Sequence, residues 1–411
     1  MSTHFNLLDE QKVMRDPVHG YIHVDYQLIW DLINAPEVQR LRRIHQLGGT
    51  HMVYHGAEHS RFSHSLGVYE VVRKMIDKVS GLNEALSDVE KLALLCAGLL
   101  HDVGHGPFSH SFESVTKTSH ETFTDRIIIE DTTINSILRQ YDESLPKLVS
   151  DIIAHRHPRK LLTQVISSQL DADRMDYLLR DSYFTGVSYG EFDLGRILRT
   201  MKVVDDRIVI KESGIHAVED YIMARYQMYW QVYLHPASRS FEAIMHSLFL
   251  RMRDLYEEGT DLLDDVSFFK PFIANTSIPL SAHFILDEST CMYGFTQLMS
   301  SKDAVLKDLS TRLVNRILFK YEDLKNSIQL NAIQQQTESL GLNPKYYVVE
   351  DFITQTLYQK PYQKNKDDGI YVLSDGELIE LSEASGIVRG FVGGVDKEDR
   401  KVFFPSEDNY E

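Results

Sequence analysis

The chain has 411 residues and a formal net charge of −17 at pH 7, with 43% hydrophobic and 25% charged residues. This length exceeds what one small hydrophobic core requires, so we expect one large domain with an appendage, or two domains. The acidic balance argues against a broad nucleic-acid surface, because phosphate binding depends on a basic footprint. The sequence shows no apolar signal region, no membrane-length apolar segment and no CxxC motif. We therefore expect a cytoplasmic protein with neither nucleic acid nor membrane as a partner.

Amphipathic helices dominate the first part of the chain. Helical patterns cover four segments, 65–79, 88–103, 165–184 and 215 to about 256. Ser87 or Asp88 can cap the second of these helices. The last one is expected to bend near Pro236, since proline removes a backbone hydrogen bond. Between the last two helices, RIVIKESG at 207–214 is typical of a short hairpin strand.

The sequence changes character in its last third. A further helix is predicted over 310–324, and strand patterns occupy 345–351, 369–381 and 400–405. We therefore predict a mainly α protein with a short β-hairpin. Its helical domain would cover residues 1–301, with a core at about 45–240. A smaller α+β region would cover 302–411, and we expect it to pack between subunits.

A cluster of titratable residues ends the predicted helix over 88–103, in the stretch AGLLHDVGHGPFSHSF. The adjacent His101 and Asp102 can offer a neutral nitrogen and an anionic oxygen to one divalent cation. His64 in RFSHSLG and Asp173 in LDADRMDYLLRD could complete a shell of two histidines and two aspartates. Such a shell would leave room for water and a phosphate oxygen.

Each of these residues also has an ordinary structural role to consider. A lone histidine is usually a core or surface residue, and a carboxylate-rich helix is usually a solvated face. The combination favours a metal site, because without one every residue of the set would have to have its ordinary structural role at the same time. Helical spacing places one set of side chains on a common face, namely Asp173, Tyr177, Arg180 and Asp181. The loop residues His105 and His110 can donate protons or bind phosphate near neutral pH.

The chain resembles the deoxynucleoside triphosphate triphosphohydrolases, which belong to the HD-domain superfamily of metal-dependent phosphohydrolases. The resemblance rests on an ordered set of motifs between Lys12 and His235, namely DPVHGYI, QRLRRIHQLGG, RFSHSLGV, LLHDVGHGPFSH and DADRMDYLLRD. It implies a helical HD-domain core that splits a dNTP at the α-phosphorus into a deoxynucleoside and tripolyphosphate. No SAM domain, as found in the mammalian enzyme, precedes the HD region, so we expect an enzyme of the bacterial type.

The resemblance also implies roles for individual residues. One divalent ion (Mn, Fe, Mg or Zn) would be held by His64, His101, Asp102 and Asp173. His110 and His120 would protonate the leaving 5′-oxygen, with Glu113 orienting His110. Gln46 and Asp181 would recognise the sugar 3′-hydroxyl. The residues expected to bind the triphosphate are Arg61, His105, Arg174, Tyr177 and Arg225.

Two further residues, Leu47 and Tyr233, match positions that contact the sugar in the family. Together they would enclose C2′ and exclude a 2′-hydroxyl. Four side chains on the long helix fall four apart and share a face, namely Tyr221, Arg225, Tyr229 and Tyr233. Core packing is the ordinary role of such a stripe. Because an unpaired buried arginine is costly, Arg225 favours substrate binding by this face, including Tyr229.

The family also has an activating nucleotide site near the N-terminus, formed between subunits. Matching positions here are Lys12, Val13, Gln39 and Arg42. Asn34 stands where the mammalian enzyme has a guanine-selecting aspartate, so the choice of activator stays open. The implied partners are a dNTP substrate, a GTP or dGTP activator, and further copies of the chain in a homotetramer.

Two other functions are compatible with the same residues. The chain could be another HD phosphohydrolase, such as a nucleotide monophosphatase or a cyclic-nucleotide phosphodiesterase. It could also be a nucleotide-sensing regulatory protein with little turnover. Arg61, Arg174 and Arg225 favour a substrate with a longer phosphate chain than a monophosphatase or a phosphodiesterase would bind. The predicted catalytic histidines, His110 and His120, argue against a sensor with little turnover.

Overall fold

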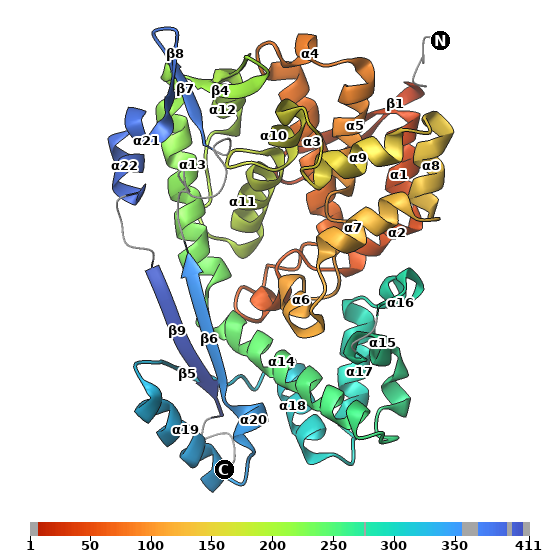
Figure 1. Cartoon of the computed structure of the whole chain (residues 1–411), viewed down its shortest axis with the longest axis vertical. Coiled ribbons are helices and arrows are strands. Elements are labelled where there is room, and N and C mark those ends of the chain that lie inside the picture. Colours follow the sequence, from red (N-terminus) through yellow and green to blue (C-terminus); the bar gives the residue numbers. More distant parts are fainter. Residues whose placement is uncertain (1–6, 275–276, 356–368, 393–396, 406–411) are drawn as a thin grey trace.

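The computed structural model describes residues 7–274, 277–355, 369–392 and 397–405 and shows a mainly helical fold, which confirms the predicted fold class (Figure 1). The N-terminal hairpin consists of β1 (Leu7–Asp16) and β2 (Gly20–Tyr26). The helices that follow are α1 (Gln27–Asn34), α2 (Pro36–Arg40), α3 (Arg61–Lys78), α4 (Leu82–Ala85), α5 (Asp88–Leu100), α6 (His110–Thr116), α7 (His120–Ile129), α8 (Thr133–Tyr141), α9 (Leu145–Ile153), α10 (Lys160–Ile166), α11 (Ala172–Thr185) and α12 (Leu194–Thr200).

A second hairpin then leads into the helices that connect the two halves of the molecule. This part contains β3 (Met201–Val204), β4 (Arg207–Lys211), α13 (Ile215–Met228), a π-helical turn (Tyr229–Tyr233) and α14 (Pro236–Glu257). The remaining elements are α15 (Lys270–Ile273), α16 (Leu280–Ile285), α17 (Glu288–Leu298), α18 (Ala304–Asn315), β5 (Lys320–Asp323), α19 (Ser327–Ser339), α20 (Pro344–Tyr347), β6 (Val349–Gln355), β7 (Tyr371–Ser374), β8 (Glu377–Glu380), α21 (Leu381–Ala384), α22 (Gly386–Val392) and β9 (Lys397–Phe404). Among the described helices, none combines the length and apolarity needed to cross a membrane.

Helices α3, α5 and α11 pack together at the centre of the first half. Ser87 caps α5 in a reciprocal capping box with Glu90, and the Ser60 side chain caps α3. Every residue from Leu92 to Leu100 is buried, as expected for a helix that protein surrounds on all sides. The two helices predicted in this region are confirmed.

Two glycines let these three helices approach one another closely. A Cβ on Gly98 of α5 would lie 2.9 Å from a Val72 methyl group on α3. A Cβ on Gly67 of α3 would lie only 1.9 Å from the Asp176 carboxylate on α11. Since real Cβ atoms do not approach other atoms so closely, glycine is required at Gly67 for α3 and α11 to meet as they do.

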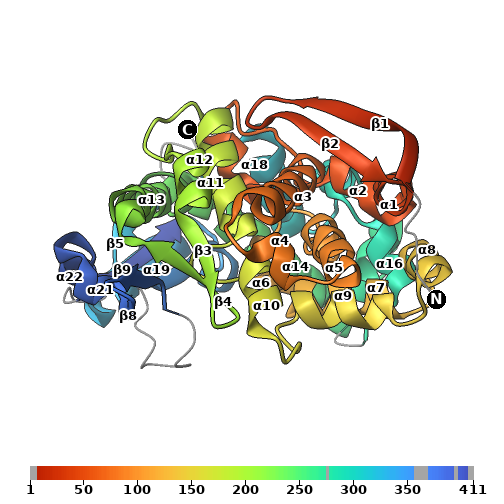
Figure 2. The same ribbon diagram turned by 90° about the horizontal axis from the view of Figure 1, so that it is seen from above.

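The C-terminal strands belong to two separate sheets. Strands β7 and β8 extend the second hairpin, in the order β3-β4-β7-β8, and β4 pairs with β7 in parallel through Ile210 and Val372. The other sheet has the order β5-β9-β6. Val372 and Leu381 lie in the same hydrophobic core as α3 and α5, whereas Phe403 lies in the core of α14, α17 and α18. Figure 2 shows β8, α21 and α22 at one edge of the molecule, far from the β1–β2 hairpin. A division at residues 301/302 stays a prediction.

Two predicted helices are wrong in part because the chain turns inside them. The segment 165–184 forms α10 and α11, since Asp171 leaves helical geometry and caps α11 by accepting the Arg174 N–H. In the segment 310–324, α18 ends before Arg316, which has a positive φ of 57°. The chain then continues into β5.

The long helix predicted from 215 to 256 is interrupted. It ends as α13 at Met228, continues as a π-helical turn over Tyr229–Tyr233 and resumes as α14 at Pro236. The break at Pro236 agrees with the predicted bend, but the π turn was not predicted. Such turns insert one residue into the helical repeat and are frequent at functional sites.

Candidate active site

Four predicted ligand side chains converge where α3, the end of α5 and the first turn of α11 meet. His64 Nε2 lies 3.2 Å from His101 Nε2 and 3.1 Å from Asp173 Oδ1. The Asp102 carboxylate oxygens lie 3.7 Å from His64 Nε2 and 3.4 Å from His101 Nε2. The structure thus brings together all four residues of the predicted metal shell, here called the His/Asp cluster.

The ring orientations of the two histidines fit a metal ion. His64 Nδ1 lies 2.8 Å from Asp176 Oδ2, and His101 Nδ1 lies 3.0 Å from the Gly98 carbonyl oxygen. Both acceptors need a proton on Nδ1, so the neutral rings turn their Nε2 lone pairs toward the cluster. Two such lone pairs beside two carboxylates repel one another unless a cation lies between them. His64, His101 and Asp173 form a donor set that could hold a divalent ion, and Asp102, 3.4 Å from His101 Nε2, could add a second carboxylate.

The electrostatics of the cluster favour positive charge. Burial opposes the charged form of His64, but hydrogen bonds to Asp173 and Asp176 outweigh it and raise the pKa of His64 to about 10. Burial also opposes ionisation of Asp173, yet its contacts with His101 and His64 hold its pKa well below the usual range. The carboxylates therefore create a negative potential in a site shielded from water, which favours a bound cation.

A second group of titratable side chains lies beside the cluster. Ligand atoms of Asp102, His105 and His120 all lie within 4.8 Å of one another. The rings of His105 and His120 stack with their centroids 3.8 Å apart. Glu113 Oε1 lies 2.6 Å from His120 Nδ1 and accepts the backbone N–H of His120 at 2.5 Å. Glu113 therefore orients the His120 ring, as the positioning of a general acid requires.

The predicted pairing of Glu113 with His110 is not tested by these contacts. His110 begins α6, but its side chain lies outside the described part of the chain. The loop before it is unusual, because Phe108 and Ser109 have φ angles of 55° and 54°, which residues other than glycine rarely adopt. Such backbone strain persists only where the surroundings hold it, and it is common at functional sites.

Glu288 of α17 and Arg61 of α3 hold this strained loop. Glu288 Oε1 accepts the Phe108 N–H at 3.0 Å, and it also accepts the His45 N–H at 3.0 Å. Arg61 donates to Ser109 Oγ from Nε at 3.0 Å and from Nη2 at 2.8 Å. The loop bearing His110 is therefore fixed between two elements that are distant in sequence.

The three arginines predicted to bind phosphate differ in their contacts. Arg61 Nη1 contacts Asp102, and Arg174 Nη1 donates to Asp171 Oδ2 at 2.5 Å. Arg225 on α13 is half-buried, and no carboxylate of the described residues pairs with it. Burial raises the pKa of the Tyr177 hydroxyl, whereas the positive charges of Arg174 and Arg225 act to lower it. Both arginines therefore lie near the Tyr177 ring. A half-buried guanidinium without a carboxylate partner suits an anionic ligand.

The residues predicted to contact a sugar form a connected polar group. Asp181 Oδ1 lies 2.8 Å from His59 Nε2, and Asp181 Oδ2 accepts the Tyr233 hydroxyl at 2.7 Å. The backbone N–H of Gln46 donates to the His59 carbonyl at 2.9 Å. The buried Gln46 Oε1 has no hydrogen-bond partner among the described residues, which leaves it available to a ligand hydroxyl.

Aromatic rings surround this group. Tyr177 and Tyr229 each meet Tyr233 edge to face, with centroids 6.1 Å and 5.5 Å from it. Leu47 is partly buried against the main core. Leu47, Tyr229 and Tyr233 are thus partly exposed rather than fully buried core residues.

Comparison with known proteins identifies the family. Residues 61–181 match the HD domain, and residues 192–269 match the HD associated region. A phosphohydrolase structure from Bacteroides thetaiotaomicron is 31% identical, covers 97% of this chain and 100% of that chain, and superposes with a TM-score of 0.84. The chain belongs to the HD-domain phosphohydrolase family.

Relatives of this HD phosphohydrolase include proteins with and without a named activity. The uncharacterized protein YwfO of Bacillus subtilis is 47% identical, over 97% of this chain and 93% of its own length. The human deoxynucleoside triphosphate triphosphohydrolase SAMHD1 is 27% identical, over 85% of this chain and 63% of its own length. The Dictyostelium discoideum homologue of SAMHD1 is 32% identical, over 65% of this chain and 54% of its own length.

The predicted activator residues of the phosphohydrolase lie on β1 and around α1 and α2. Lys12 is half-buried and Val13 is exposed on β1, while Asn34 ends α1 and donates to the Trp30 carbonyl at 2.7 Å. Gln39 Oε1 accepts from Arg42 Nε at 2.8 Å. The Arg42 guanidinium also lies over the Phe62 ring, 3.7 Å from its centroid. Their role in activation stays a prediction.

Some positioning residues of the phosphohydrolase, or their contacts, were missed by sequence reasoning. Arg180, predicted on the face of Asp173, is fully buried and donates to Asp176 and Asp16, and this pairing was not predicted. The i,i+4 spacing of Asp176 and Arg180 is a signal that could have indicated this ion pair. Glu288 and His59 were also missed, because each meets its partners only through tertiary packing.

Proposed function

We propose that this phosphohydrolase converts deoxynucleoside triphosphates to a deoxynucleoside and tripolyphosphate. The observation that carries the proposal is that Asp173, Tyr177 and Asp181 follow one face of α11, which leads from the His/Asp cluster to the polar group around Asp181. Eight residues of helix span about 12 Å, which is the scale of a nucleotide. A ligand lying along this face would have phosphate at the cluster and sugar at Asp181.

The chain's own residues suit each step of this reaction. A bound divalent ion would polarise the α-phosphate and lower the pKa of an attacking water. His120, held through Nδ1 by Glu113, would donate a proton to the leaving 5′-oxygen, which would otherwise depart as a costly alkoxide. Arg225 would neutralise phosphate charge, with Arg61, His105, Arg174 and Tyr177 completing the phosphate-binding set.

The sugar end of the proposed site would bind the 3′-hydroxyl and exclude a 2′-hydroxyl. Gln46 Oε1, buried without a partner among the described residues, would accept a hydrogen bond from the 3′-hydroxyl. Asp181 has lone pairs beyond those used by His59 and Tyr233, and would accept a second. Leu47 and Tyr233 would enclose C2′ and leave a 2′-hydroxyl without a partner.

Ion chromatography of the products from a dNTP mixture tests this function. Metal-loaded protein is expected to release tripolyphosphate and deoxynucleosides in equal amounts, and Asp102→Ala, which loses an anionic ligand, is expected to release neither. Orthophosphate as the product would favour a different HD phosphohydrolase. The absence of any product would favour a nucleotide-sensing protein.

The proposal includes a GTP or dGTP activator bound between subunits of a homotetramer. Its support is the placement of Lys12 on the first hairpin and of Arg42 just after α2, where the Arg42 guanidinium lies over the Phe62 ring. Lys12→Ala combined with Arg42→Ala is expected to abolish stimulation by GTP while basal turnover survives. Analytical ultracentrifugation with and without GTP would test the tetramer.

A further inference from the structure

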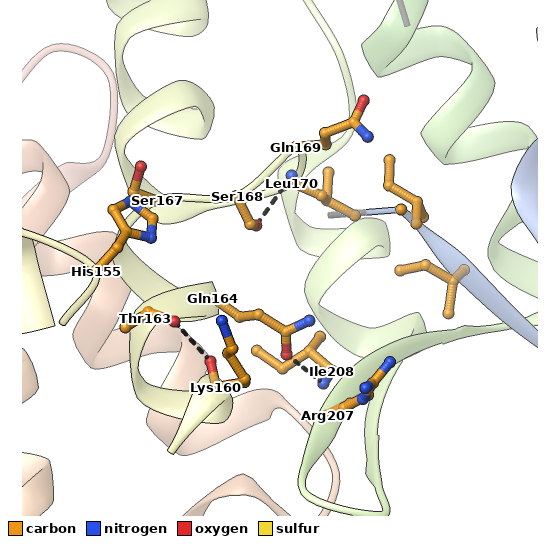
Figure 3. A pocket seen from close by; sticks show the side chains of 13 residues that line it. His155, Lys160, Thr163, Gln164, Ser167, Ser168, Gln169, Leu170, Arg207 and Ile208 are labelled. Atoms are coloured by element: carbon orange, nitrogen blue, oxygen red, sulfur yellow. Dashed lines mark hydrogen bonds between the residues drawn. The ribbon is translucent and has the colours of Figure 1, made fainter. Parts of the chain in front are cut away.

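The active site is held by contacts that are local in sequence and by contacts from the distant helix α17. Figure 3 shows a local one: in the turn that leads into α11, beside a small cavity, Ser168 Oγ accepts the Leu170 N–H at 3.2 Å. The Ser168 carbonyl also accepts from Arg174 Nη1 at 2.6 Å, so these contacts join residues no more than six positions apart. By contrast, Glu288 of α17 reaches two active-site loops that lie 180 and 243 residues earlier in the chain.

These two loops meet beside α17. The sugar loop, residues 45–49, carries Gln46 and Leu47, which would contact the sugar. The donor loop, residues 105–109, leads to His110, one of the two histidines that would protonate the leaving oxygen. In the proposed reaction the sugar and the leaving oxygen belong to one substrate. The spacing between the two loops therefore has to match that substrate.

The sugar loop and the donor loop pack directly against each other. Ser109 Oγ donates to the His45 carbonyl at 3.1 Å. Gly48 lies so close to the donor loop that a Cβ there would be 3.0 Å from the Phe108 carbonyl oxygen. The donor loop is also strained, because Phe108 and Ser109 both have positive φ angles. Strained backbone keeps its geometry only where the surroundings impose it, so the donor loop needs a contact that holds it.

Glu288 supplies such a contact to both loops at once. Its Oε1 accepts the Phe108 N–H at 3.0 Å and the His45 N–H at 3.0 Å, and its Oε2 contacts His45 Nδ1. The Glu288 side chain is only 5% exposed. A buried carboxylate is costly unless donors surround it, so its burial favours the arrangement in which both N–H groups point at Oε1. Glu288 therefore stabilises one spacing between the sugar loop and the donor loop.

The position of Glu288 is itself fixed by α17. Asp287 caps this helix by accepting the Thr290 N–H at 2.9 Å. The Phe108 ring also packs on α17, nearly parallel to Phe295 with centroids 6.1 Å apart. Glu288 lies outside both regions that match the HD domain and the HD associated region. Neither family match therefore assigns it a role.

We propose that Glu288 is a positioning residue of the proposed hydrolysis, and that it sets the spacing between the sugar loop and the donor loop. This role rests on the proposed function. Glu288 would act on the reaction only through the backbone N–H groups of His45 and Phe108. Its removal should displace the proton donor from the leaving oxygen and Gln46 from the 3′-hydroxyl together. The His/Asp cluster lies where α3, the end of α5 and α11 meet, and should keep its metal ion.

Steady-state kinetics of tripolyphosphate release by the full-length, metal-loaded protein test this role. Glu288→Ala is expected to lower kcat with dATP about 10- to 100-fold, the scale of misplacing a catalytic group by about 1 Å. It should also reduce the preference for dATP over dideoxy-ATP, because Gln46 moves with the sugar loop. Glu288→Gln keeps an oxygen that can accept both N–H groups and should recover most of the lost turnover. If Glu288→Ala does not fold, Glu288→Asp, which keeps the charge but shortens the side chain, should show the same two losses.

Glu37→Ala is the matched control for these variants. Glu37 is also a buried glutamate that accepts a backbone N–H, from Thr133 of α8 at 2.8 Å. Its loss should lower the urea midpoint but leave kcat and the dideoxy-ATP preference unchanged. The role would be overturned by a wild-type kcat in Glu288→Ala, by a fall in kcat with an unchanged preference, by equal losses in both alanine variants, or by no recovery in Glu288→Gln. No tripolyphosphate from the wild type would instead overturn the proposed function, and this role with it.

Discussion

Asp176 lies 2.8 Å from His64 Nδ1 and so directs the other nitrogen of that ring into the His/Asp cluster. Asp176 is itself fixed, because Arg180 donates to both of its oxygens at 2.9 Å and His19 Nε2 lies 2.6 Å away. Burial opposes its ionisation, but Arg180 and the two histidines hold the pKa of Asp176 well below the usual range. A buried, permanently charged carboxylate thus sets the tautomer of His64.

Replacing this carboxylate should weaken the metal site without touching a ligand. We expect Asp176→Asn to reduce metal affinity about 10- to 100-fold, the usual effect of losing such a supporting contact. Competition with a chelator measures the affinity, and Asp151→Asn, at a carboxylate paired with Lys147 and Arg156, is the control. Unchanged affinity in Asp176→Asn would show that the His64 ring is oriented by other contacts.

Gly67 should be the least replaceable glycine of the central helices. A Cβ there would fall 1.9 Å from Asp176 Oδ1 and must separate α3 from α11. We expect Gly67→Ala to destabilise the protein by about 1–3 kcal/mol, the usual range for overpacking. Gly390→Ala on α22, where a Cβ meets open space, is the control and should leave stability unchanged or higher. Urea denaturation of both variants provides the comparison.

His120 should matter to turnover more than to binding. Proton donation helps only as the leaving oxygen gains charge, so His120→Ala is expected to lower kcat by roughly 10²- to 10⁴-fold with little change in KM. Glu113→Gln should lower kcat less, because the ring remains but loses its charged partner. His216→Ala, at an exposed histidine of α13, is the control. A rise in KM alone would make His120 a binding residue.

The loop before the sugar-binding residues should respond to pH through His45. Burial opposes its charged form, but Glu288 and Glu58 outweigh it and raise the pKa of His45. A raised pKa in the folded state adds stability that is complete below the ordinary value of 6.5 and is lost as pH rises through the folded value. The stability difference between wild type and His45→Gln should therefore be largest near about pH 6 and shrink above it. A constant difference from acid to alkaline pH would remove His45 from this role.

The proposed sugar gate predicts a preference for deoxyribonucleotides. A 2′-hydroxyl enclosed by Leu47 and Tyr233 would lose its water partners, at a cost of roughly 1–3 kcal/mol, or about 5- to 150-fold in rate. Values of kcat/KM for dATP and ATP in wild type, Leu47→Ala and Tyr233→Ala measure the preference. Equal use of both nucleotides by the wild type would remove the gate, and unchanged discrimination in both variants would place its cause elsewhere.

The sequence predicted the helices and ligand types better than their junctions. His64, His101, Asp102 and Asp173 lie in local motifs, and helix packing then brings His101 and Asp173 within 3.2 Å, and Asp102 within 3.7 Å, of His64 Nε2. The turn at 167–171 was missed because a capping aspartate and a helix-interior aspartate look alike without the fold.

The π turn at Tyr229–Tyr233 and the strained backbone at Phe108 and Ser109 could not be predicted from the sequence either. Both depend on tertiary contacts, such as the bond from Glu288 to the Phe108 N–H, that have no local pattern in the sequence. The C-terminal strands were predicted, but the parallel pairing of β7 with β4 was not, because parallel pairing joins segments far apart in the chain.

Turnover of a dNTP in water enriched in oxygen-18 tests the central claim most directly. Water attack at the α-phosphorus breaks the bond to the 5′-oxygen, so the deoxynucleoside keeps its own oxygen and the label enters tripolyphosphate. We predict one labelled oxygen per tripolyphosphate molecule and none in the deoxynucleoside, as read by mass spectrometry. Label in the deoxynucleoside, or in released orthophosphate or pyrophosphate, would contradict the account.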